Sequence, residues 1–161
     1  MSQAEITKAS IKEQVLRWGV ESAGFSPAGR WEESKDVSAQ YYPRVIWPQT
    51  KTVIVLAVPD LPAVALPAEL GLAEWNAANE LMDVAAYRLA VFLNDKGYPS
   101  VNIPVDSSGE YILENKTVPV FSHLWAGYYA GIIPIKPNHG RKDSFKLKLV
   151  SVLTALEWGE D

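Results

Sequence analysis

The sequence contains no cysteine among its 161 residues. This absence excludes a disulfide framework, a thiolate zinc site, an iron–sulfur cluster and a cysteine nucleophile held by this chain alone. The sequence also lacks an excess of basic residues, because 15 lysines and arginines face 19 aspartates and glutamates, which gives a formal charge of −4. Proteins that bind duplex nucleic acid usually need a basic surface, so we expect no nucleic-acid partner.

Long hydrophobic runs are missing as well. The longest, Val53–Pro59, is far shorter than the roughly 20 residues that cross a bilayer. The first five residues are polar and lack the basic and apolar regions of a targeting signal. We therefore expect a cytoplasmic protein with no membrane partner. The 48% of hydrophobic and 21% of charged residues are typical of one globular domain and not of a disordered chain.

The spacing of apolar residues predicts an α/β fold. Val53–Val58 is apolar on both faces, which is typical of a central strand covered on both sides. Residues 73–96 carry a broad apolar stripe at helical spacing and form the longest predicted helix. We also expect helices over 4–18 and 119–129, a short helix with a loop over 29–42, and strands over 22–28, 101–105 and 145–156. This order predicts a single-domain α/β (α+β) fold, with a mixed sheet flanked by helices.

Four segments, in order, carry a family resemblance. They are Gly24–Ala28, Pro48 with Lys51–Pro59, Leu93–Pro104, and Phe121–Gly131 with its Phe-Ser-His start and Ala-Gly end. Together with the tail Val150–Thr154, they resemble the N-terminal catalytic domain of epoxyqueuosine reductases and the related corrinoid-dependent reductive dehalogenases. The resemblance spans most of the chain, and it depends on the order and spacing of the segments.

The resemblance implies a domain like that of flavin nitroreductases, which in this family holds a corrinoid instead of flavin. It also implies a ferredoxin-like domain with cysteine clusters after Thr154. We expect that domain to be absent, because the sequence has no cysteine and stops at Asp161. A glycine-rich stretch that contributes to the family's cofactor surface is missing after Gly131. An enzyme of this kind would be an oxidoreductase that depends on an external electron donor, such as a separate iron–sulfur protein.

Five residues are candidates for a functional site. The resemblance places Asp106 near a carboxylate that serves as proton donor in the reductases, which makes it the candidate catalytic residue. Ser122, His123, Tyr128 and Gly131 lie around the segment that resembles the family's cofactor turn, so they are the candidate cofactor-binding residues. The residues alone leave a second interpretation open. In it, Asp106 belongs to a turn that caps its own backbone, and His123 is a structural histidine with one nitrogen on a backbone carbonyl.

Other chemistry-bearing residues predict no further site. His139 lies in a turn, and two histidines so far apart without a carboxylate pattern do not predict a metal site. The basic residues from Lys136 to Lys148 are either a solvated face or a surface for an anionic partner. Trp125 and Trp158 are candidates for a subunit contact in a homodimer.

Three hypotheses for the function remain open. The first is a stand-alone relative of the epoxyqueuosine reductase catalytic domain that binds a corrinoid or works with a separate iron–sulfur protein. The second is a non-catalytic module for dimerisation or protein interaction that has lost the cofactor site. The third is a flavin-binding protein like the nitroreductases. The substrate and the reaction stay open in all three.

Overall fold

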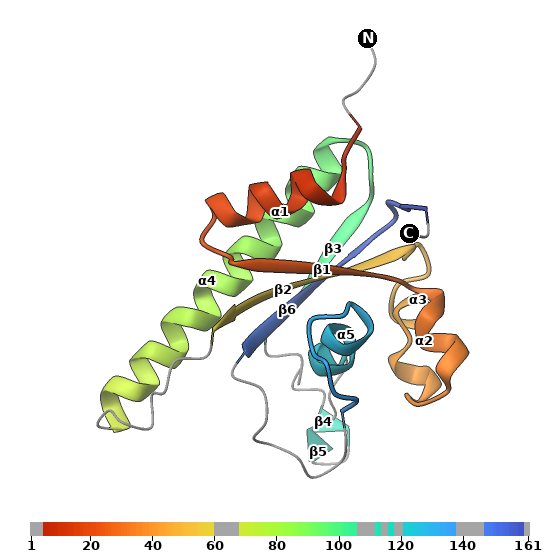
Figure 1. Ribbon diagram of the computed structural model, residues 1–161. Helices are drawn as coiled ribbons and strands as arrows, with labels where there is room; N and C mark the ends of the chain where they lie inside the picture. Colours follow the sequence, from red (N-terminus) through yellow and green to blue (C-terminus); the bar gives the residue numbers. More distant parts are fainter. Residues whose placement is uncertain are drawn as a thin grey trace.

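The computed structural model describes residues 5–59, 68–105, 112–113, 116–117, 121–137 and 147–159, with the backbone alone for 68–76, 112–113 and 116–117 (Figure 1). The helices are α1 (Lys8–Arg17), α2 (Gly29–Ser34), α3 (Pro43–Ile46), α4 (Ala68–Asp95) and α5 (His123–Tyr129), with a short 3-10 turn η1 (Ala39–Tyr41). The strands are β1 (Ser22–Pro27), β2 (Thr52–Pro59), β3 (Ser100–Ile103), β4 (Ile112–Leu113), β5 (Lys116–Thr117) and β6 (Leu147–Thr154).

The main sheet has four strands in the order β1-β2-β6-β3. The predicted α/β fold, with helices flanking a sheet, is confirmed. The sheet differs from the expected mixture of strand directions in that every described pair in it is antiparallel. The reason lies in the position of β6. Strands β2 and β3 run in the same direction and are connected through α4, but β6 lies between them and runs opposite to both.

Strand β2 is central, as predicted from its apolar sequence. It is buried from Thr52 to Val58, because β1 and β6 pair with its two edges and helices cover its two faces. Ile54 and Leu56 contribute to one core, whereas Val53 and Val55 contribute to the other. This alternation follows from the period of two in a strand, which sends successive side chains to opposite faces.

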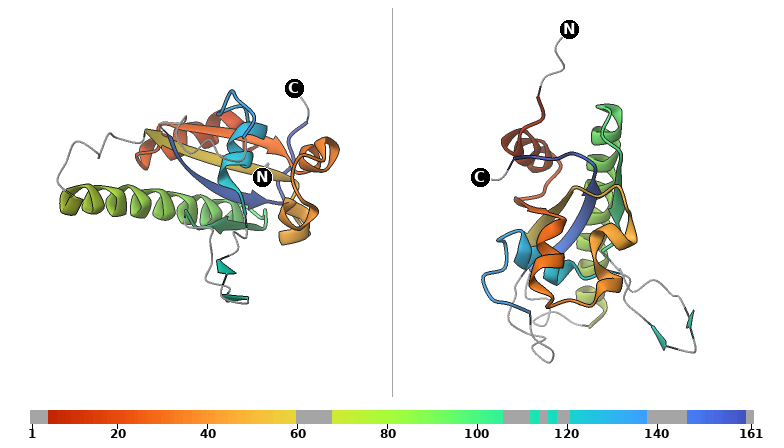
Figure 2. Two further views of the ribbon diagram at one scale, coloured as in Figure 1. Left: turned by 90° about the horizontal axis from the view of Figure 1, so that it is seen from below. Right: turned by 90° about the vertical axis from the view of Figure 1, so that its right-hand side faces the viewer.

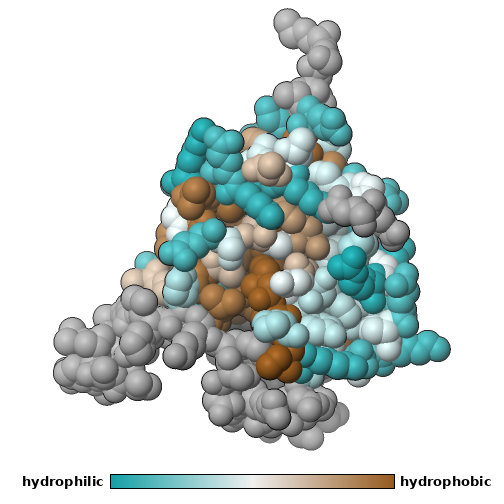
Figure 3. Space-filling view, in the orientation of Figure 1, coloured by the Kyte–Doolittle hydropathy of each residue, from teal (hydrophilic) through white to brown (hydrophobic). Residues whose placement is uncertain are grey.

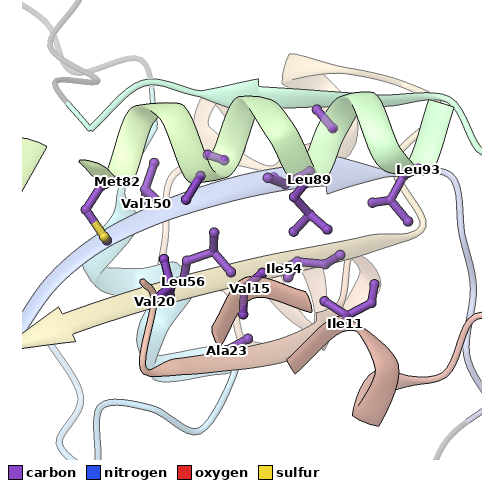
Figure 4. Close-up of a cluster of buried hydrophobic side chains, with 14 of the residues drawn as sticks. Ile11, Val15, Val20, Ala23, Ile54, Leu56, Met82, Leu89, Leu93 and Val150 are labelled. Atoms are coloured by element: carbon purple, nitrogen blue, oxygen red, sulfur yellow. The ribbon is translucent and has the colours of Figure 1, made fainter. Parts of the chain in front are cut away.

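The first core lies between the sheet and helices α1 and α4 (Figure 4). Leu89 and Leu93 from α4 and Ile11 and Val15 from α1 are fully buried there. The predicted helix over 73–96 is confirmed in type, and α4 extends further toward the N-terminus. Its C-terminal end is followed by Gly97, whose φ of 94° suits glycine.

The second core lies on the opposite face of the sheet, beneath α2 and α5 (Figure 2). Its largest side chains are Trp31, Phe121 and Tyr129. Gly24 of β1 lies against the end of α5, where a Cβ atom would be 2.9 Å from the carbonyl oxygen of Ala130. A glycine at this position therefore allows α5 to approach the sheet edge closely.

Candidate functional site

Helix α5 begins at His123, so the start predicted near residue 119 is wrong. Phe121 and Ser122 are not helical, and the Ser122 side chain accepts a hydrogen bond from the backbone N–H of Trp125 at 3.2 Å. A serine in this position satisfies one of the free N–H groups of the first turn. This cap places His123 and Trp125 on the first turn, close to the sheet.

The imidazole of His123 is buried between α5 and the sheet. Its Nε2 lies 2.6 Å from the carbonyl oxygen of Pro104, and its Nδ1 lies 2.8 Å from the hydroxyl oxygen of Ser151 on β6. A carbonyl oxygen only accepts, so Nε2 carries the proton, and in the neutral ring Nδ1 accepts from Ser151. Burial lowers the pKa of His123 below its ordinary value of 6.5, although the Pro104 carbonyl and the Asp83 carboxylate act in the opposite direction.

A second hydrogen bond fixes the same stretch of chain from the opposite side. The backbone N–H of Val105 donates to the carboxylate of Asp83 on α4 at 2.7 Å. Pro104 and Val105 are therefore held by α5 on one side and by α4 on the other. Asp106, the candidate catalytic residue, follows directly in the sequence and lies outside the described residues.

A cleft of about 590 Å³ lies between the first turn of α5 and the segment after α2. Its walls combine aromatic rings with hydroxyls and one ion pair, in which Lys136 Nζ lies 2.7 Å from Asp36 Oδ1. The hydrogen bond to Asp36 raises the pKa of Lys136 above its ordinary value. The cleft is lined by Asp36, Val37, Ser38, Tyr41, Phe121, Ser122, Leu124, Trp125, Lys136 and Pro137.

An aromatic cluster forms the floor of this region. Trp125 stacks on Tyr129 with ring centroids 5.6 Å apart and meets Tyr128 edge-on at 5.8 Å. Trp31 packs against both Phe121 and Tyr129, and the Tyr129 hydroxyl bonds to Ser34. In Figure 3, hydrophobic atoms gather near the centre of this face, and the surface becomes more hydrophilic toward α2. The cleft thus offers flat apolar walls beside polar groups, which suits a planar molecule with a polar edge.

The four candidate cofactor-binding residues do not meet in one pocket. Ser122 lines the cleft, Tyr128 is half-buried beside Trp125, and His123 is buried against Ser151. Gly131 is exposed in the turn after α5, where its φ of 78° suits glycine. His139 lies outside the described residues. Because both ring nitrogens of His123 form hydrogen bonds, His123 has no free nitrogen to act as a base in the cleft.

Sequence reasoning did not assign Asp36 or Ser38 to the site. They lie far from α5 in the sequence, and the fold of α2 brings them to the cleft. Lys136 was seen only as part of a basic cluster. No short sequence motif links these residues to Ser122, so the spacing of residues in the sequence could not predict that they lie close to it.

Two general properties concern the described part of the chain. It contains no group of three or more histidine, aspartate or glutamate side chains that could hold a metal ion. No helix in it is long and apolar enough to cross a membrane.

The fold defines a class of protein: an α/β domain in which helices cover both faces of a four-stranded sheet.

No family model matches the sequence, and no curated protein matches it. The fold is similar to that of epoxyqueuosine reductase from Streptococcus thermophilus, with a TM-score of 0.54 and 16% sequence identity over 96% of this chain. A structure of epoxyqueuosine reductase with a tRNA-Tyr stem loop carrying epoxyqueuosine matches with a TM-score of 0.49 and 13% identity, over 96% of this chain and 46% of that chain. This chain spans 47% of the Streptococcus thermophilus enzyme's length, so the likeness concerns about half of that protein.

Proposed function

We propose that this chain is a relative of the epoxyqueuosine reductase catalytic domain, and that it binds a flat cofactor in the cleft between α5 and the segment after α2. A corrinoid is the first candidate for the cofactor. The observation that carries the proposal is the aromatic-walled cleft beside Ser122, on a fold similar to that of epoxyqueuosine reductase. The sequence resemblance of Phe121–Gly131 to the family's cofactor turn supports the same location.

The cleft fits part of such a group. Its volume of about 590 Å³ lies within the range of small-molecule sites, roughly 300–1,000 Å³. A corrinoid is larger, so the cleft would take one edge of the ring, with Trp125 and Tyr41 against the apolar surface and Lys136 beside the polar periphery. His123 has no nitrogen left for a metal ion, because both of its ring nitrogens form hydrogen bonds within the protein.

The roles of the chain are binding, orientation and the exclusion of water. A bound corrinoid would supply the redox chemistry. Because these 161 residues include no cysteine, an iron–sulfur centre that delivers electrons would be held elsewhere, and we propose a separate iron–sulfur protein as the donor. Asp106 remains the candidate proton donor because the resemblance places it near the family's carboxylate. Pro104 and Val105, directly before it, are fixed by hydrogen bonds.

Cobalamin retention tests the proposal. Ser38 is exposed, and its side chain makes no capping hydrogen bond, so Ser38→Trp adds bulk to the cleft without removing a helix cap. We expect the wild type and the Ser38→Ala control to retain cobalamin on a desalting column, measured by absorbance, and Ser38→Trp to lose most of it. Failure of the wild type to retain cobalamin under both oxidising and reducing conditions rejects corrinoid binding. Retention of flavin instead, seen as a yellow fraction, favours the nitroreductase-like alternative.

A second candidate function is a protein-interaction module without a cofactor. One observation favours it: both ring nitrogens of His123 and one face of Trp125 are engaged by the protein itself, so these groups stabilise the fold. This candidate predicts a stably folded chain that retains neither cobalamin nor flavin. Retention of either cofactor that is sensitive to Ser38→Trp contradicts it.

A further inference from the structure

The outward face of α4 is unusually apolar. Leu81, Val84, Tyr87 and Val91 on this helix have exposed fractions of 41%, 49%, 61% and 40%. The buried face of the same helix, which includes Met82 and Leu89, already packs on the sheet. A surface helix normally shows charged or polar residues on its solvent side. A second apolar stripe therefore indicates a surface that binds another protein chain.

The stripe continues into a shallow groove of about 340 Å³ where the end of α1 meets α4. Four of the groove residues on α4, Ala77, Leu81, Val84 and Arg88, follow the spacing of four, three and four that keeps side chains on one side of a helix. One acidic and one basic residue, Glu80 and Arg88, stand on either side of Val84 in this stripe. The groove is lined by Trp18, Ala77, Glu80, Leu81, Val84, Ala85 and Arg88.

We propose that α4 pairs antiparallel with α4 of a second copy of this chain, around a two-fold axis at Val84. In such an interface the same patch meets itself, so residues at equal distances before and after the axis come to the same level. Leu81 then lies level with Tyr87 of the second copy, and Ala77 lies level with Val91. The apolar residues of the stripe thus lie level with apolar residues of the second copy.

The charges select this arrangement over others. At the same two-fold axis, Glu80 of one copy lies level with Arg88 of the other, twice by symmetry. A parallel pairing in register would place Glu80 opposite Glu80 and Arg88 opposite Arg88, which repels. Within the described part of the chain, neither residue forms an ion pair of its own, so both are available. A heterologous partner would not need this self-complementary order, and we therefore assign the second copy as the occupant.

This interface does not depend on the proposed function. Helix α4 covers one face of the sheet, whereas α5 covers the other (Figure 2). The cleft is lined by residues at the start of α5. The interface also differs from the subunit contact expected at Trp125 and Trp158. Trp125 stacks on Tyr129 and lines the cleft, and Trp158 packs on Phe25 while its Nε1 donates to the carbonyl of Ile6.

A charge exchange tests the pairing, with association measured by sedimentation equilibrium. Both Glu80→Arg and Arg88→Glu place like charges at the same level, and we expect each to weaken dimerisation more than tenfold. The double variant Glu80→Arg/Arg88→Glu restores the opposite pairing, and we expect it to dimerise about as well as the wild type. Because both residues are exposed, these substitutions test association rather than folding, and circular dichroism checks that each variant is folded.

Two further variants complete the experiment. Val84→Asp places a carboxylate on the two-fold axis, and we expect it to be monomeric. Val45→Asp on α3, which is 58% exposed on another element, is the matched control and should remain a dimer. A wild type that sediments as a monomer at millimolar concentration overturns the proposal, and so does a double variant that fails to recover dimerisation.

Discussion

The Nε2 atom of His123 lies 2.6 Å from the carbonyl oxygen of Pro104, which joins the first turn of α5 to the chain just after β3. The other ring nitrogen bonds to Ser151 on β6, so one side chain connects three segments that are far apart in the sequence. This favours the interpretation of His123 as a structural histidine. In the proposed function, His123 would act indirectly, through the position of the segment that leads to Asp106.

The buried imidazole makes stability depend on pH. Because the pKa of His123 is lowered in the folded chain, the unfolded chain binds a proton first as the pH falls below 6.5. The contribution of His123 to the free energy of unfolding is therefore fully present above pH 6.5. It decreases as the pH falls toward the pKa of His123 in the folded chain. We expect urea unfolding midpoints of the wild type to fall over this interval more steeply than those of His123→Gln. His139 is present in both proteins and cancels, so equal slopes would contradict the assignment.

The bond between Asp83 and Val105 gives a second prediction. Asp83→Ala removes the acceptor of a half-buried backbone N–H, and a hydrogen bond to a charged group contributes about 1.5–3 kcal/mol. We expect a loss of this order in the free energy of unfolding, measured by urea denaturation. Asp83→Asn keeps an acceptor oxygen and is the control, with a smaller loss. Equal losses of unfolding free energy in the two variants would contradict this expectation, because they would show that the negative charge of Asp83, and not its acceptor oxygen, stabilises the fold.

The strongest sequence patterns predicted the elements well. Strand β2 has seven buried residues in a row, from Thr52 to Val58, and its β-branched, apolar sequence favours a central strand. The long helix was also recognised, because Leu89 and Leu93 continue one apolar stripe and Gly97 marks its end. Such elements are local, so the information that specifies them lies within a few turns or one strand.

The order of the strands and the contacts between elements could not be predicted from local sequence patterns. The insertion of β6 between β2 and β3 depends on long-range pairing, such as that of Ser151 with Val55 and with Ile103. The partners of His123 depend on the same arrangement. The start of α5 was predicted from Pro119, but Ser122 is the residue with the capping hydrogen bond, and it was the better signal.

Gly24 provides a test of how closely α5 approaches the sheet. In Gly24→Ala, the new methyl group would lie 2.9 Å from the backbone oxygen of Ala130 and 2.9 Å from Ile132 Cγ1. The backbone oxygen belongs to the end of α5 and moves only with the helix, so we expect a loss of about 1–3 kcal/mol. Gly159→Ala, with no atom within 4 Å of the added carbon, is the control for thermal unfolding. Equal melting temperatures for both variants would place α5 further from β1.

Ser122 allows capping to be separated from ligand binding. Its side chain accepts from Trp125 N–H, so Ser122→Ala should lower the free energy of unfolding by about 1 kcal/mol. Ser122→Asp supplies another good capping acceptor and should keep the stability near that of the wild type. The carboxylate nevertheless adds a charge to the wall of the cleft. If the cleft binds cobalamin, we expect Ser122→Asp to be stable but to retain less cobalamin; full retention by this variant would move the cofactor away from Ser122.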